Sequence, residues 1–315
     1  MDELQAENTD LLPEPEDNQF EPARYDWPPA YILILLLTAI LVGSVLGALL
    51  AEMICRLNGA TVETLINSLN IDSPLADRNL SRWVNGAAHI ATFTLPALAV
   101  AIVLYRRRWA PFLAIDKSPD FRYLLAGVLL IVSAFPLVQW LYWVNKTYIP
   151  MPEAWRQLES STQDMVEALL VMNSPGEFWL SIFIVAVLPA IGEELLFRGV
   201  IQPQLERWFK QPHLAIAITA LVFSIIHFQF EGFLPRFALG VVLGYLAWWS
   251  RSLWPAIGAH FAFNGVQVLA TFLFAEEIDK AKLEEQSPNL LMVLTSIVVV
   301  MAIGQYLKKT NLQRQ

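Results

Sequence analysis

Residues 178–200 read FWLSIFIVAVLPAIGEELLFRGV, an apolar run that carries two acids and one base in its second half. The run is long enough to cross a lipid bilayer, whose hydrocarbon core is about 30 Å thick. Glu193, Glu194 and Arg198 therefore lie where an ionisable group is costly and usually functional. This stretch predicts a membrane protein and also the position of its functional site.

The composition of the whole chain supports an integral membrane protein. Its 315 residues are 56% hydrophobic and 16% charged, whereas soluble proteins carry about 25% charged residues. The apolar residues gather in runs that are long enough to span the bilayer. We expect these runs to be helices, because lipid cannot form hydrogen bonds with a free backbone. The runs cover residues 30–54, 85–105, 122–144, 177–203, 212–229, 233–249, 253–275 and 289–307. We therefore expect an all-α membrane protein, a polytopic bundle of about eight transmembrane helices.

Charge is distributed unevenly along the chain. Residues 1–28 hold nine acids and one base, Arg24, which accounts for the formal net charge of −8. We expect this segment to be a disordered acidic cytoplasmic tail. Lys and Arg favour the loops on the side of loop 106–122, with 13 residues against 8 on the other side. This bias predicts that both termini are cytoplasmic, and we expect the plasma (inner) membrane.

The chain divides into four parts by composition. They are the acidic tail 1–28, N-terminal transmembrane helices with a polar loop (29–174), core helices that carry the polar residues discussed below (175–275), and a last helix with a short basic C-terminus (276–315). Within the polar loop, residues 154–171 have helical spacing and are expected along the external surface. Gly240 and Gly244 form a GxxxG pattern, which we interpret as close helix packing.

The acids and the base of the opening stretch have different environments. Glu194 and Arg198 are four residues apart on one helical face, and pairing lowers the cost of burying either charge. Glu193 points about 100° away from Glu194 and cannot fully share that pair. We therefore expect Glu193 to act as a general base.

Further polar side chains lie in the following apolar runs. His260 and Asn264 are four residues apart, and His227 ends another run with Phe223 one turn before it. A glutamate and a histidine from different helices can hold a water and take its proton, while a second histidine and an asparagine can donate to an oxyanion. The first half offers only His89, and we interpret its spans as scaffold.

The same residues resemble the motifs of a known family. Residues 192–199, GEELLFRG, resemble the EExxxR motif of the CPBP family of CAAX prenyl proteases and bacteriocin-processing, Abi-like intramembrane peptidases. Residues 223–227, FSIIH, resemble its FxxxH motif, and residues 260–264, HFAFN, its HxxxN motif. The resemblance covers about residues 175–275. It implies an intramembrane endopeptidase that acts on membrane-attached or membrane-proximal substrates.

The resemblance also implies a role for each motif residue. Glu193 and His227 would activate the water, and His260 and Asn264 would bind the oxyanion. The residues implied to support them are Glu194, Arg198 and Phe223. We expect membrane lipid and a peptide or protein substrate as partners, and no nucleic acid.

We expect no cofactor, although a metal is the main alternative. The chain lacks the HExxH pattern, and its one cysteine excludes a cysteine-based cluster. If zinc is present, Glu193, His227 and His260 would be its ligands.

Two functions of other classes stay open. The polar groups could belong to a catalytically silent binding or immunity protein. They could also relay protons in a proton-coupled transporter, because buried Glu and His serve there too. The sequence shows no internal repeat of the kind common in transporters.

Overall fold

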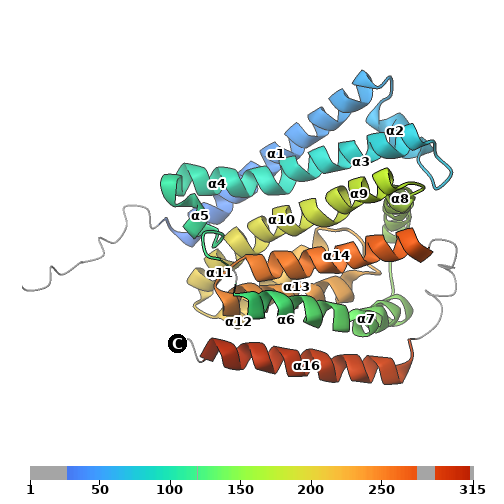
Figure 1. Ribbon diagram of the computed structural model, residues 1–315. Helices are drawn as coiled ribbons and strands as arrows, with labels where there is room; N and C mark the ends of the chain where they lie inside the picture. The colour runs from blue at the N-terminus through green and yellow to red at the C-terminus, as the bar shows by residue number, and fades with distance from the viewer. Residues whose placement is uncertain (1–26, 119, 275–287, 313–315) are drawn as a thin grey trace, which may run out of the picture.

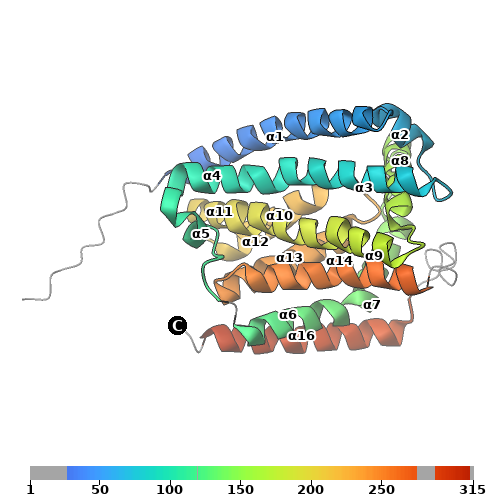
Figure 2. The same ribbon diagram turned by 45° about the horizontal axis from the view of Figure 1, so that its top comes forward.

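The computed structural model describes residues 27–118, 120–274 and 288–312, which form helices and no strand. Most helices lie side by side, with α1 on one flank and α16 on the other (Figures 1 and 2). Their bounds are α1 Pro29–Leu57, α2 Val62–Ser68, α3 Leu75–His89, α4 Leu95–Tyr105, α5 Trp109–Phe112, α6 Phe121–Ser133, α7 Phe135–Tyr148, α8 Glu153–Leu170, α9 Pro175–Ser181, α10 Leu188–Glu194, α11 Gln202–Phe209, α12 Pro212–Ile225, α13 Phe233–Ser250, α14 Trp254–Phe274 and α16 Leu290–Leu312. The all-α prediction is confirmed.

The described residues contain six helical stretches that are long and apolar enough to cross a membrane. A seventh arises if α6 and α7, which meet at a bend of 46°, count as one span. On α1, apolar side chains such as Leu41, Val45 and Leu49 are each 62% exposed, as expected for a surface that contacts lipid. The chain is an integral membrane protein.

The difference from eight expected spans lies in α12. This helix has 14 residues, about 21 Å at 1.5 Å per residue, which is shorter than the hydrocarbon core. The chain then turns at Phe228, which has a positive φ of 51°. His227 therefore lies inside the bundle, where a full-length span would have carried it to the opposite membrane surface.

Close packing of α12 against α13 supports the interpretation of the GxxxG pattern. A Cβ at Gly240 would lie 2.9 Å from the Cβ of Ala220, and one at Gly244 would lie 2.8 Å from the side chain of Ile216. Small residues are therefore required for these two helices to approach as they do.

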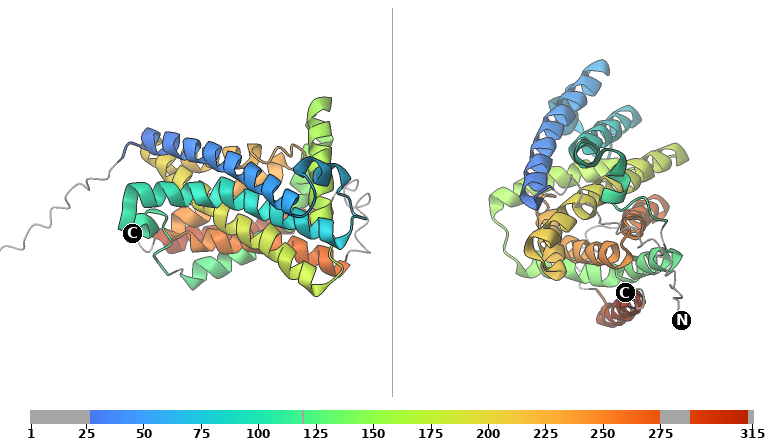
Figure 3. Two further views of the ribbon diagram at one scale, coloured as in Figure 1. Left: turned by 90° about the horizontal axis from the view of Figure 1, so that it is seen from above. Right: turned by 90° about the vertical axis from the view of Figure 1, so that its left-hand side faces the viewer.

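Helix α8 was expected along the external surface, and its placement relative to the membrane stays a prediction. It runs across the bundle, roughly perpendicular to the other helices (Figure 3). Ala168 and Leu169 at its end are buried. The buried Arg82 of α3 donates to the carbonyl of Leu169 at 3.2 Å and to Glu177 Oε1 at 3.1 Å. The C-terminal turn of α8 thus belongs to the interior.

The described chain begins and ends at the same end of the bundle (Figure 1). This agrees with two termini on one side of the membrane, and the cytoplasmic assignment stays a prediction. The expected acidic tail, up to residue 26, lies outside the described residues.

Candidate active site

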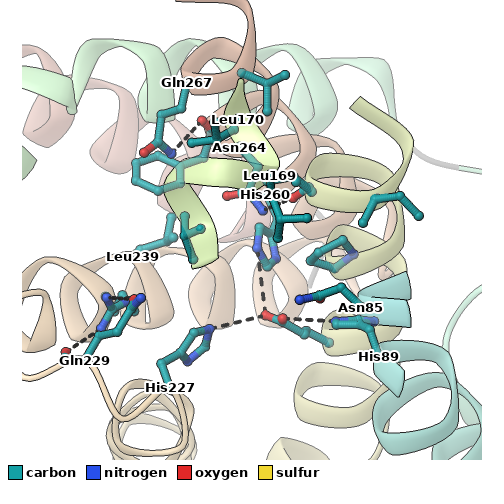
Figure 4. A pocket seen from close by; sticks show the side chains of 18 of the residues that line it. Asn85, His89, Leu169, Leu170, His227, Gln229, Leu239, His260, Asn264 and Gln267 are labelled. Carbon is teal, nitrogen blue, oxygen red and sulfur yellow. Dashed lines mark hydrogen bonds and ion pairs between the residues drawn. The ribbon is translucent and has the colours of Figure 1, made fainter. Parts of the chain in front are cut away.

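A cavity of about 430 Å³ lies among α3, α8, α10, α13 and α14. Figure 4 shows its lining side chains. The polar residues in its wall are Asn85, His89, Glu193, His227, Gln229, Arg236, His260, Asn264 and Gln267. The cavity therefore brings together all four side chains predicted as catalytic, from three separate apolar runs.

Glu193 is the central acid of this cavity and is only 5% exposed. Its Oε1 lies 3.2 Å from His89 Nε2. Its Oε2 has no hydrogen-bond partner, and it lies 4.0 Å from His227 Nε2 and 3.9 Å from His260 Nε2. These two distances are too long for hydrogen bonds, and a water can bridge such a gap. One carboxylate oxygen is thus held by His89, and the other is buried without a hydrogen-bond partner between His227 and His260.

Hydrogen bonds indicate which nitrogen carries the proton in two of these histidines. His227 Nδ1 lies 2.7 Å from the carbonyl oxygen of Phe223, which can only accept. His260 Nδ1 lies 2.8 Å from Glu194 Oε1, and Nδ1 is again the donor if that carboxyl group is ionised. In their neutral forms both rings therefore present an Nε2 lone pair towards Glu193.

The predicted pair of Glu194 and Arg198 is present and fully enclosed. Arg198 Nη1 donates to Glu194 Oε1 at 2.7 Å, and Nη2 donates to the carbonyl of Gly240 at 3.0 Å. The guanidinium carbon lies 4.8 Å from the ring centroid of Phe223, at cation–π distance. Because Glu194 also bonds His260, the pair anchors one wall of the site.

Asn264 lies one helical turn from His260 and lines the cavity. Its amide nitrogen donates to the carbonyl of Val185 at 3.1 Å. An amide has two N–H donors, so one remains available to a group in the cavity. The oxyanion role proposed for Asn264 is compatible with this arrangement and stays a prediction.

His89 is the residue that the sequence interpretation assigned to scaffold, and the structure corrects this. It ends α3, 104 residues before Glu193 in the chain, and it stacks on Phe93 with ring centroids 4.7 Å apart. A Cβ at Gly192 would lie 3.0 Å from His89 Cε1 and 2.5 Å from Thr94 Oγ1. The glycine before Glu193 thus leaves room for the histidine. One feature of the sequence could have indicated His89, because it is the one histidine in the first three apolar runs.

Three π-helical segments adjoin the site, at Ile90–Thr94, Ile182–Val187 and Leu195–Ile201. The first follows His89, and the other two flank α10, which carries Glu193. Such segments are rare and frequently occur at functional sites. They change the direction in which the neighbouring side chains project, so ideal helical geometry could not place these residues.

The donor set does not fit a tetrahedral zinc ion in this arrangement. No group of three His, Cys, Asp or Glu side chains in the described residues is close enough to bind a metal. Two ligands of zinc, each about 2.0–2.1 Å from it, lie about 3.3 Å apart. Glu193 Oε2 lies 3.9 and 4.0 Å from the two ring nitrogens. We derive no step through a metal, and metal independence stays a prediction for a chelation experiment.

Comparison with known proteins adds one finding. Residues 175–266 match the family model described as Type II CAAX prenyl endopeptidase Rce1-like. No curated protein and no solved structure matches the chain. The matched segment contains all three sequence motifs, and the match confirms the resemblance that they indicate. His89 lies outside it.

Proposed function

We propose that the chain is an intramembrane endopeptidase whose water is activated by Glu193 and His227, on the premise that residues 175–266 match the Type II CAAX prenyl endopeptidase Rce1-like family model. The observation that supports the proposal is that three histidines surround Glu193, which has one carboxylate oxygen bonded to His89 and the other without a hydrogen-bond partner. The cavity lies in a helical membrane bundle, which suits peptides that are attached to or close to the membrane.

The first step follows from the acceptors in the cavity. A water between Glu193 Oε2 and the neutral His227 Nε2 donates one proton to each, since both atoms are acceptors. Its oxygen lone pairs then point towards the substrate. As the water oxygen attacks the peptide carbonyl, a proton passes to Glu193 or His227 and later to the leaving amine. His89 holds Oε1 and so keeps Oε2 turned to the water.

The developing oxyanion needs donors on the other side of the carbonyl. Asn264 supplies its second amide N–H, and His260 supplies Nε2–H when its ring carries a proton. Nδ1 of that ring lies 2.8 Å from the Glu194 carboxylate, which holds the ring in place. Donors placed where charge develops contribute most when water is excluded, as in a buried site.

The test is peptide cleavage by the full chain in detergent or liposomes. The substrates are quenched fluorescent peptides, with and without lipid modification. We expect Glu193→Gln and His227→Phe to reduce turnover by about a hundredfold to ten-thousandfold, the range for a general base. His213→Phe is the matched control, because His213 is exposed and bonds Tyr245 on α13.

A strong chelator distinguishes water activation without metal from a mechanism that depends on zinc. Cleavage that survives chelation supports water activation without metal. Cleavage that chelation abolishes and zinc restores contradicts it and makes the same side chains ligands. No cleavage of any peptide by folded wild-type protein contradicts the endopeptidase assignment and favours a catalytically silent binding protein.

A further inference from the structure

Arg236 lies in the wall of the same cavity and has no part in the proposed chemistry. It is the one Lys or Arg among the described residues that line this space. The residue sits in the first turn of α13, where the helix macrodipole disfavours a cation and favours an anion. A half-buried cation in such a place requires a partner.

The guanidinium group hydrogen-bonds to neutral groups, although the charges of Glu159 and Glu193 act on it from a longer distance. Arg236 Nη1 donates to the backbone carbonyl of Gln229 at 2.6 Å, and Nη2 donates to the side-chain oxygen of Gln229. The group rests on Gly232, where a Cβ would collide with it. A guanidinium has five N–H donors, so three remain beyond these two bonds.

The neighbouring acids are engaged elsewhere. Glu159 of α8 accepts from the backbone N–H groups of Phe230 and Glu231. The carboxylate of Glu231 accepts from the hydroxyl of Tyr142 at 2.8 Å and lies 3.8 Å from Lys146 Nζ. Arg236 makes no ion pair with any acid in the part of the chain that the structure describes.

We propose that Arg236 binds a carboxylate of the peptide substrate, which makes the enzyme selective for peptides with a negative charge near the cleaved bond. The inference rests on the proposed function for its meaning in catalysis. Gln229 holds the planar guanidinium from one side, and the fork that it leaves open matches a carboxylate. In Figure 4 Gln229, which holds the guanidinium group, lies on the other side of His227 from His89.

Two sources of the carboxylate have the same chemistry. It is either the C-terminal carboxylate of the substrate or the side chain of an Asp or Glu. Three labelled apolar heptapeptides distinguish them: one with a free C-terminus, one with a C-terminal amide, and one amide with a glutamate in the sequence.

Binding is measured first, by fluorescence anisotropy with the full-length Glu193→Gln variant in detergent. We expect one of the two acidic peptides to bind about tenfold to a hundredfold more tightly than the neutral amide, as for hydrogen bonds to charged groups. Adding Arg236→Gln should bring this ratio close to one, and Arg236→Lys should retain part of it. Arg156→Gln is the charge-matched control, because Arg156 is exposed and pairs with Glu153.

Two results would overturn the inference. One is equal binding of the acidic and neutral peptides. The other is a preference that persists in the Arg236→Gln variant, or that Arg156→Gln removes equally.

Cleavage by the wild type is measured separately. Hydrolysis without a carboxylate preference refutes the subsite alone. A preference that depends on Arg236, without hydrolysis by the wild type, refutes the endopeptidase assignment and leaves the binding site intact.

Discussion

Replacing His89 by phenylalanine removes one hydrogen bond from the general base and little else. Phenylalanine keeps the planar ring that stacks on Phe93 at 4.7 Å. It loses the contact of 3.2 Å between Nε2 and Glu193 Oε1. The carboxylate is then free to rotate, and its second oxygen is no longer held towards His227.

The structure sets the size of the expected effect. Hydrogen bonds to charged groups contribute about 1.5–3 kcal/mol, and a separation of 3.2 Å places this one at the lower end. About 1.5–2 kcal/mol corresponds to a tenfold to thirtyfold lower kcat. Because His89 acts through Glu193, we expect KM to change less than kcat.

Steady-state kinetics on a cleaved peptide tests this expectation. His89→Gln should recover part of the lost kcat, since its amide N–H can reach the same oxygen. His213→Phe, the same change at an exposed histidine of α12, should leave the kinetics as in the wild type. Wild-type kcat in His89→Phe would refute the reasoning, as would a loss in His89→Gln equal to that in His89→Phe.

Two further changes test the surroundings of the base. Arg198→Met removes the guanidinium partner of Glu194, which is 0% exposed. This substitution should lower the free energy of unfolding in detergent by about 3–5 kcal/mol. A change below about 1 kcal/mol would contradict the pairing. Gly192→Ala places a Cβ 2.5 Å from Thr94 Oγ1 and 3.0 Å from His89, and should lower kcat by about tenfold to a hundredfold through displacement of His89. Adding Thr94→Ala should restore part of that activity, and full activity of Gly192→Ala alone would show that the contact is not needed.

The parts of the fold and the site that the sequence predicted correctly depend on the spacing of residues close together in the chain. Apolar runs of spanning length predicted the helices because lipid cannot satisfy a free backbone. The four-residue spacing of Glu194 and Arg198 predicted their contact, which forms although Arg198 lies in the π-helical segment Leu195–Ile201. These results need no knowledge of how distant segments meet.

The depth of His227 could not be predicted from its spacing. Straight, upright helices would have placed His227 and Glu193 at different depths. Because α12 ends early and the chain turns at Phe228, His227 Nε2 lies 4.0 Å from Glu193 Oε2. The length of an apolar run does not reveal where a helix stops, because Phe228 at the turn is as apolar as the helix before it.

The sequence by itself therefore determined that this is a helical membrane protein, and it located the acids, histidines and asparagine of the candidate site. Only the tertiary structure decided that His89 holds the general base and that Arg236 faces the same cavity. The contact of His89 with Glu193 joins helices far apart in the chain, and the cavity that Arg236 lines is formed by several separate helices. Which faces of two helices meet depends on the close packing of the whole bundle, and a helix's own sequence does not encode its neighbour.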